Sequence, residues 1–265
     1  MAFKIKYLFS DMDGTLLDPR KHISDETVQA VQAFTTQGGF FAVATGRSPE
    51  ICRPFLKKVP VNAPCILLNG AGVYDFDTGR YLHQEYLPGN LLPAICRTAQ
   101  NAYSQICIEA FAEGPIQILS PDCILDHYIT EEKQPYVYTD YAESGRYMKL
   151  LLYAHPEKLK TVYTQLRPLL EGKVSFTFSS PFYLEILPLG VSKGTALQWI
   201  CETGGLSREQ VAAVGDFDND QEMLRYSGLG AAPANASPAA KAAANLLLPD
   251  NDHHCVSNLI HTFMK

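Results

Sequence analysis

Short apolar runs alternate with amphipathic stretches in the first part of the chain. Residues 5–10, 40–44 and 65–68 are short and apolar, as buried strands are, and polar or small residues follow each run directly. Residues 24–39 carry apolar side chains at helical spacing, beginning at a serine that can cap a helix and ending at a glycine pair. Strands that alternate with helices pair in parallel, so the pattern predicts an α/β fold with a doubly wound, Rossmann-like parallel sheet.

The rhythm changes in the middle of the chain. The turn signal Asp77-Thr78-Gly79 lies between two strand-like pieces, and the residues beyond it mix helical with strand-like patterns. Helices are predicted over residues 91–103 and 156–170, and strands over 106–110, 147–153, 174–178 and 183–187. We therefore expect an inserted α+β cap domain at residues 83–187, carried by a core domain made from residues 1–82 and 188–265.

The α/β rhythm returns after the insertion. Helices are predicted over residues 192–202, 218–226, 237–244 and 256–263, and strands over 211–214 and 246–248. Open α/β sheets bind ligands at the carboxyl ends of their strands. Polar residues stand at four such ends in this sequence, namely Asp11 with Asp13, Thr45, Asn69 and Asp216. They should converge on one crevice.

Two carboxyl groups follow the first predicted strand, in the segment Asp11-Met12-Asp13-Gly14-Thr15. Alternate residues of an extended chain face the same side, so both carboxyl groups can point into one site. A divalent cation, a shared proton or both would relieve the repulsion between them. Gly14 allows the chain to turn sharply as it leaves the strand.

A second acidic segment, residues 216–220, follows the strand predicted over 211–214. Several oxygen ligands close to a phosphate suit Mg²⁺, which prefers a few carboxylates completed by water and substrate oxygens. The aspartates of this segment also imitate the first ligands of an EF-hand loop. However, Gln221 and Ser227 stand where that loop needs Gly and Glu, which argues against the EF-hand interpretation.

Two further segments offer hydrogen-bond donors or positive charge to a phosphate. Thr45-Gly46-Arg47 lies at a strand-to-helix turn, where a hydroxyl and backbone N–H groups can cradle a phosphate, although an ordinary turn has the same pattern. Lys193 lies near the start of a predicted helix and offers a point charge. A single lysine is more often a solvated surface residue, so neither segment identifies a site alone.

Together these pieces resemble the motifs of the haloacid dehalogenase (HAD) superfamily. Asp11 to Thr15 is similar to its DxDGT motif, and Gly215-Asp216 with Asn219-Asp220 is similar to its fourth motif, GDxxND. Thr45 matches the second motif and Lys193 the third, in the same order and at a similar wide spacing. The resemblance covers nearly the whole chain, and the combination is specific to the superfamily.

Residues 69–71 and 190–194 further resemble the Cof-type subgroup of phosphatases. In that subgroup a large α/β cap of type IIB lies between the second and third motifs, where the insertion is predicted here. The resemblance implies a HAD-like hydrolase core and a cap that closes over the site and selects the substrate. One departure is the segment 232–236, which differs from the glycine-containing segment of many relatives.

The resemblance also implies roles for individual residues. Asp11 would attack phosphorus and form an aspartyl-phosphate, which splits a difficult step into two easier ones. Asp13 would protonate the leaving oxygen and then deprotonate the water that hydrolyses the intermediate. Mg²⁺ would be held by the Asp11 carboxylate, the Asp13 backbone carbonyl and Asp216, and would neutralise charge on the transferring phosphoryl group.

Further residues would bind the phosphate or the substrate. The resemblance implies this role for Thr45, Gly46, Arg47, Asn69, Lys193 and Asn219. Asp220 would position Lys193 or metal-bound water without binding the ion itself. For Arg47 two interpretations stay open, since its guanidinium can face the substrate or the cap, or form a salt bridge that orients the loop.

Composition narrows the function in other ways. The net charge of −6 and the absence of a Lys/Arg run argue against nucleic acid or an anionic membrane as a partner. The seven cysteines, an odd number without a CxxC pair, are typical of reduced thiols in a cytoplasmic protein. No apolar run is long enough to span a membrane. We expect a monomer or homodimer whose partner is a small phosphorylated metabolite.

The leading hypothesis is a magnesium-dependent phosphatase of sugar phosphates, nucleotides or cofactor phosphates. A phosphomutase acting on a sugar phosphate would use the same residues but would keep water out until the phosphate is returned. A catalytically weak regulatory protein that binds a metabolite is a third hypothesis, although such a protein would be expected to have lost Asp11 or Asp13. The sequence does not identify the substrate.

Overall fold

The computed structural model describes residues 5–141 and 145–264. Within them the chain divides into two units, which we call the first and the second unit. The first unit contains the residues up to His83 and those from Ser192 onward, and the second contains Gln84–Val191. The sequence placed the insertion at residues 83–187. Nearly all of the motif residues lie in the first unit.

The first unit is built on a five-stranded sheet in which every neighbouring pair is parallel. Its strand order is β14-β13-β12-β1-β2, so the first strand lies inside the sheet between strands from both ends of the chain. The bounds are β1 Tyr7–Ser10, β2 Phe40–Val43, β12 Val211–Val214, β13 Leu229–Pro233 and β14 Leu246–Leu248. The predicted doubly wound α/β fold is therefore confirmed.

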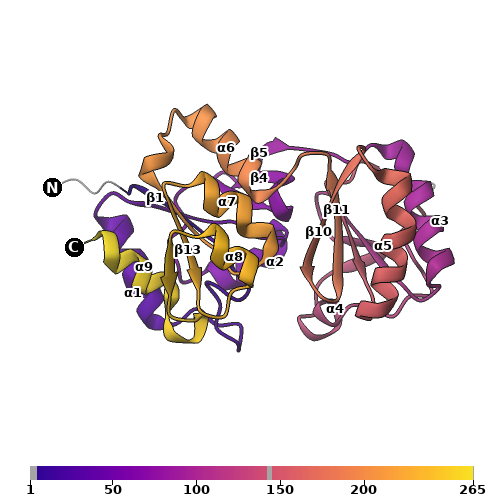
Figure 1. The fold of residues 1–265 in the computed structure, drawn as a ribbon, viewed down its shortest axis with the longest axis horizontal. Coiled ribbons are helices and arrows are strands. Elements are labelled where there is room, and N and C mark those ends of the chain that lie inside the picture. Colours follow the sequence, from indigo (N-terminus) through magenta and orange to yellow (C-terminus); the bar gives the residue numbers. More distant parts are fainter. Residues whose placement is uncertain (1–4, 142–144, 265) are drawn as a thin grey trace. The chain divides into compact units, whose positions relative to one another are not determined.

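Helices cover both faces of this sheet (Figure 1). Helices α1 (Asp25–Thr36) and α9 (Cys255–Phe263) pack on each other on one side, where the rings of Phe34 and Phe263 meet edge to face. Helices α6 (Lys193–Gly204), α7 (Gln221–Tyr226) and α8 (Pro238–Ala243) lie on the other side. This distribution follows from right-handed crossovers that run in opposite directions from the central strands. The short α2 (Pro49–Leu56) follows β2.

The third apolar run forms a small sheet of its own. Strand β3 (Cys65–Leu67) pairs antiparallel with β4 (Gly72–Asp75), and β5 (Arg80–Gln84) completes the order β3-β4-β5. A single parallel bridge between Ala44 and Ile66 joins β3 to the end of β2. Among the described residues, parallel pairing of this run with the main sheet is therefore limited to this one bridge.

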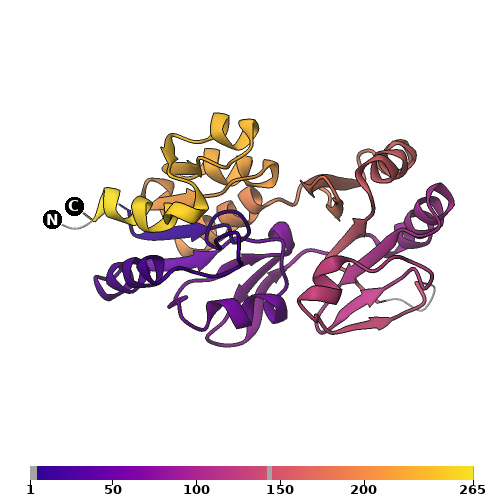
Figure 2. The same cartoon turned by 90° about the horizontal axis from the view of Figure 1, so that it is seen from below.

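The second unit is built on a six-stranded mixed sheet with the order β10-β11-β9-β6-β7-β8, in which only β7 and β8 pair in parallel among the strands described. The bounds are β6 Cys107–Phe111, β7 Ile116–Ile118, β8 Tyr136–Tyr138, β9 Lys149–Tyr153, β10 Val174–Ser180 and β11 Tyr183–Pro188. Helices α3 (Leu92–Ala102) and α5 (Pro156–Leu170) lie side by side over one face (Figures 1 and 2). The short α4 (His127–Glu131), β7 and β8 were not expected from the sequence.

The two faces of the second sheet differ in chemistry. Leu150 and Leu152 of β9 join the apolar core under α3 and α5. The alternate residue Lys149 lies on the opposite face, where it forms an ion pair of 2.9 Å with Glu185 of β11. Both of these side chains are 2% exposed, so the opposite face carries buried charge.

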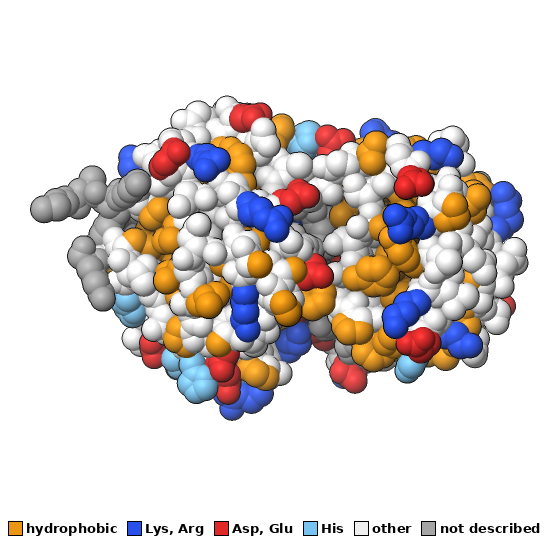
Figure 3. Space-filling model, viewed as in Figure 1, with side chains coloured by type: hydrophobic (Ala, Val, Ile, Leu, Met, Phe, Trp, Pro, Cys, Tyr) orange, Lys and Arg blue, Asp and Glu red, His pale blue; other side chains and the backbone are white. Residues whose placement is uncertain are grey.

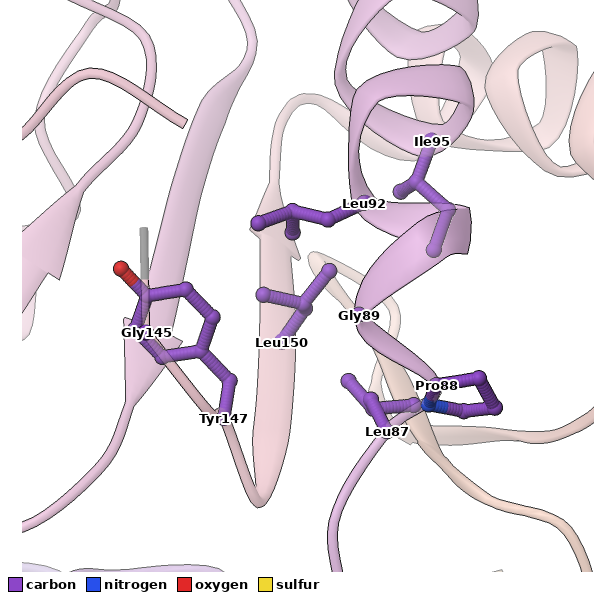
Figure 4. A pocket seen from close by; sticks show the side chains of 8 residues that line it. All are labelled: Leu87, Pro88, Gly89, Leu92, Ile95, Gly145, Tyr147 and Leu150. Carbon is purple, nitrogen blue, oxygen red and sulfur yellow. The ribbon is translucent and has the colours of Figure 1, made fainter. Parts of the chain in front are cut away.

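A small apolar pocket lies beside the start of α3 (Figure 4). Leu87, Leu92 and Leu150 point into it, and Tyr147 closes one side. The described residues that line this pocket carry no charged side chain. The visible surface likewise carries its lysine and arginine side chains dispersed rather than gathered into one patch (Figure 3). Among the helices described, none has the length and apolar character needed to span a membrane.

Candidate active site

Two aspartates from opposite ends of the chain lie side by side at one edge of the first sheet. Asp11 follows β1 directly, and Asp216 follows β12 after one glycine. These strands pair in parallel with Ser10 opposite Val214, and the Asp11 backbone N–H donates to the Val214 carbonyl at 2.9 Å. Adjacent parallel strands therefore deliver both side chains to the same edge, as the sequence pattern predicted.

A buried carboxylate cluster surrounds one lysine. Oxygens of Asp11, Asp216 and Asp220 all lie within 4.8 Å of one another. Lys193 reaches into this cluster, and its Nζ lies 2.5 Å from Asp11 Oδ1 and 2.7 Å from Asp220 Oδ1. Lys193 is only 1% exposed, so a solvated surface position is ruled out for it.

The charge of this cluster is unbalanced. Three carboxylates against one ammonium leave an excess of negative charge in a buried place. Burial raises the pKa of the Asp216 carboxyl to about 7, and the charge of Asp220 adds to the rise. Burial also raises the pKa of Asp11, although the Lys193 ammonium opposes that shift. Carboxylate oxygens with unmet charge are the environment that a hard divalent cation such as Mg²⁺ prefers, so the residues fit this ion.

Asp220 differs from its two neighbours in how its oxygens are used. Oδ1 accepts from Lys193, and Oδ2 accepts from the backbone N–H groups of Asp216 and Phe217 at 3.0 Å each. Both oxygens are thus engaged by the protein. Asp220 therefore orients Lys193 and the loop that carries Asp216, and it is less suited to bind an ion although it lies within the cluster. A capping box at Ser192 and Thr195 begins α6 and places Lys193 in its first turn.

Asp13 faces a different set of partners. Its carboxylate accepts two hydrogen bonds from Arg47, at 2.7 Å from Nε and 2.9 Å from Nη2, and a third at 2.5 Å from Lys21 Nζ. Burial alone would raise the pKa of Asp13, but Arg47 and Lys21 outweigh it and lower that pKa. The carboxyl group is therefore ionised, and Arg47 forms a salt bridge. Lys21 had no signal in the sequence, where it is one lysine among several in a loop.

Thr45, Asn69 and Asn219 form a hydrogen-bonded group beside the carboxylates. The Asn69 backbone N–H donates to the Thr45 carbonyl at 3.0 Å, and Asn219 Nδ2 donates to Asn69 Oδ1 at 2.9 Å. Gly46 lies against this group, since an added Cβ would stand 3.0 Å from Asn69 Nδ2. The sequence-predicted phosphate contacts are thus close to one another in the first unit.

Two glycines allow close approaches that shape the site. Gly70 has φ +101°, and an added Cβ would lie 2.1 Å from the Ser192 carbonyl oxygen, so this turn packs directly on the start of α6. Gly14 has φ +80°, and an added Cβ would lie 2.4 Å from Asp216 Oδ2. Asn235, in the segment that departs from the family pattern, donates to the Gly14 carbonyl at 2.8 Å and so fastens this turn.

Fold and site together define the class of protein. A family model of haloacid dehalogenase-like hydrolases matches residues 8–260. The chain belongs to this family, and the resemblance drawn from its motifs is confirmed. Among solved structures, a haloacid dehalogenase-like hydrolase from Bacteroides thetaiotaomicron superposes with a TM-score of 0.86 at 26% identity, covering 97% of this chain and 99% of that one.

Two curated relatives have names that state an activity. The HMP-PP phosphatase of Serratia proteamaculans is 27% identical to this chain, over 96% of this chain and 92% of the relative. The 5-amino-6-(5-phospho-D-ribitylamino)uracil phosphatase YitU of Bacillus subtilis is 25% identical, over 96% of each. The chain is thus similar along its whole length to phosphatases, as expected for a phosphoric monoester hydrolase of this family.

Proposed function

We propose that this protein hydrolyses phosphomonoesters of small metabolites, with Asp11 as the nucleophile. The observation that carries the proposal is the buried contact of Asp11 with Lys193, which Asp220 holds from the other side. A lysine fixed in this way orients one oxygen of Asp11. It also supplies a cation where negative charge spreads over the phosphoryl oxygens in the transition state.

The reaction would proceed in two displacements. Asp11 attacks phosphorus, the bond from phosphorus to the ester oxygen breaks, and an aspartyl-phosphate forms. Water then attacks the same phosphorus and releases inorganic phosphate together with the free Asp11 carboxylate. Thr45, Gly46, Asn69 and Asn219 would contact the phosphate, which the hydrogen-bonded group around Asn69 supports.

Asp13 would transfer the protons. The ionised carboxylate suits the second step, in which a base takes a proton from water. The first step needs the protonated form. We propose that the substrate phosphate competes for Arg47, which loosens the salt bridge and places a negative charge near Asp13, and both effects raise its pKa. Arg47 would thus belong both to the resting salt bridge and to the substrate contacts.

Mg²⁺ would be held by the carboxylates of Asp11 and Asp216 and by the backbone carbonyl of Asp13. When bound, the ion would offset the excess negative charge of the cluster and that of the substrate phosphate. Asp220 would remain outside the ligand set because both of its oxygens are already engaged.

The names of the two curated relatives support a small metabolite as the substrate class, and they differ in the compound that each acts on. A phosphomutase would use the same constellation, and a transfer of phosphate back to a product would distinguish it. Net release of free phosphate from several esters would favour the hydrolase instead.

The test is phosphate release from a panel of phosphorylated metabolites, with and without Mg²⁺. Native chain, Asp11→Asn and Asp77→Asn are compared. Asp77 is an exposed turn residue of the same unit, so its variant makes the same chemical change outside the site. We expect magnesium-dependent release from a few esters by the native chain and Asp77→Asn, and none by Asp11→Asn. If the native chain releases nothing, or Asp11→Asn equals it, the proposal fails and the regulatory hypothesis takes its place.

A further inference from the structure

Two cysteines of the second unit lie on neighbouring segments. Cys107 begins β6, and β6 pairs antiparallel with β7 so that Glu109 stands opposite Ile118. The same ladder continues outward, since the Leu119 N–H donates to the Ile108 carbonyl and the Ile108 N–H donates to Ser120 Oγ, both at 2.9 Å. This register places Ser120 beside Cys107.

The chain then turns back toward β6 and carries Cys123 with it. The Cys123 N–H donates to the Ser120 carbonyl at 3.2 Å, and the Ile124 N–H donates to the Gln105 carbonyl at 3.0 Å. Backbone hydrogen bonds thus hold the chain on both sides of Cys123 to the start of β6. The two thiols are near enough for each to shift the pKa of the other, and Cys107 Sγ donates to Glu109 Oε1 at 3.9 Å. The backbone therefore already brings Cys123 to the segment that carries Cys107, as a disulfide between them requires.

Cys123 differs from the other cysteines in exposure. Six of the seven are buried, and only Cys123 is partly open to solvent. Hydrogen bonds from Cys107 and Ser120 lower the pKa of the Cys123 thiol to about 7, against the opposing effects of burial and the Asp122 charge. The same hydrogen bond, burial and the Glu109 charge raise the pKa of Cys107. The pair therefore consists of one accessible, acidic thiol and one buried, protonated thiol, as in dithiols that react in sequence.

We propose that Cys107 and Cys123 form an oxidisable dithiol, a modification site for small disulfides such as glutathione disulfide. The Cys123 thiolate attacks one sulfur of the small disulfide, which forms a mixed disulfide and releases one thiolate. Cys107 then loses its proton and attacks Cys123 Sγ, which releases the second small thiol. Two protein thiols are oxidised, and one external disulfide is reduced to two thiols. This site is independent of the proposed phosphatase reaction.

Tryptic digestion isolates Cys107 and Cys123 from the other cysteines. No lysine or arginine lies between Arg97 and Lys133, so trypsin leaves residues 98–133 as one peptide with Cys107 and Cys123 as its only cysteines. The reduced native chain is treated with glutathione disulfide, unfolded, alkylated and digested with trypsin, and the peptide masses are measured by mass spectrometry. We expect this peptide to lack both alkyl groups and to have lost two hydrogen atoms, while the other cysteines are alkylated fully.

Variants separate the two steps. Cys107→Ser should stop at a stable glutathione adduct on Cys123, Cys123→Ser should leave Cys107 reduced, and Cys96→Ala, a buried cysteine of the same unit, should oxidise like the native chain. Full double alkylation of peptide 98–133 in the treated native chain would overturn the proposal. If a variant does not fold, brief alkylation of the native chain decides the question. Cys123 must react before the six others, and equal slow labelling of all seven contradicts the proposal.

Discussion

Removing the charge of Lys193 should destabilise the first unit strongly. In Lys193→Met the apolar stem is largely retained, but Asp11 and Asp220 lose the ammonium that lies 2.5 Å and 2.7 Å from their oxygens. Both carboxylates are buried, at 6% and 0% exposure, so they are left without a nearby countercharge in a place that water scarcely reaches. Breaking one partner out of a buried ion pair costs about 3–5 kcal/mol, and we expect a loss in that range.

A second substitution tests whether unpaired charge is the cause. Asp220→Asn in the native background should lower the free energy of unfolding by about 1.5–3 kcal/mol, because it removes the charged hydrogen bond with Lys193. The amide oxygen can still accept from the Asp216 and Phe217 N–H groups. In the Lys193→Met background the same change removes a repulsive carboxylate, so it should be neutral or stabilising. The double variant should thus regain stability but release no phosphate.

Urea unfolding in EDTA measures the free energies. The single tryptophan, Trp199, lies on α6 and stacks on His83 with ring centroids 4.7 Å apart, so its fluorescence reports on the first unit. The four chains of the cycle are compared. If the losses of the two single variants add to within about 0.5 kcal/mol in the double variant, the residues are not coupled and the charge argument is refuted.

Two other substitutions test buried features elsewhere. Burial and the nearby Asp126 carboxyl raise the pKa of Glu109, so the folded chain keeps a proton that the unfolded chain loses. This bound proton contributes to the free energy of unfolding, fully so below the ordinary Glu109 pKa of 4.5 in the unfolded chain. As pH rises, the contribution is lost by up to about 1.4 kcal/mol per pH unit. Glu109→Gln should remove this slope in circular-dichroism unfolding between about pH 5 and 7, and parallel slopes contradict the argument. Gly70→Ala should lower the free energy of unfolding by more than the strain of a left-handed alanine, which is about 1–2 kcal/mol. The added Cβ would also clash with the Ser192 carbonyl. Gly38 also has a left-handed backbone, with φ +89°, but an added Cβ would meet no other atom, so Gly38→Ala should cost only the strain. If thermal unfolding shows the same loss of stability for both variants, Gly70→Ala causes no clash.

Much of the first unit was predictable because its signals are local and repeated. Short apolar runs ended at polar residues, and parallel strands bring such ends together, so the meeting of Asp11 with Asp216 followed from the pattern. Helix α5 was predicted with its observed bounds, Pro156–Leu170, because it has four turns of apolar periodicity. Strands β7, β8 and β13 were missed, and β13 contains Gly230 and Pro233, two residue types that are depleted in strands.

Contacts between residues that lie far apart in the sequence were harder to predict. Nothing in the sequence near Lys21 indicates that it contacts Asp13. Asn235 lies in the segment that departs from the family pattern, but its hydrogen bond to Gly14 spans 221 positions and only the fold reveals it. The motif resemblance supplied Lys193, because a lone lysine after a long insertion has no local signal for a role in a site.

The aspartyl-phosphate is the central claim, and trapping it is the most direct test. Asp13→Asn is mixed with an aryl phosphate, whose leaving group needs no proton, so Asp11 should be phosphorylated while the second step lacks its base. Borohydride reduces an acyl phosphate to the alcohol, which turns the aspartate into homoserine. We predict a burst of aryl alcohol and homoserine at position 11 in the peptide map. A burst without homoserine there, or homoserine at another aspartate, would contradict the account.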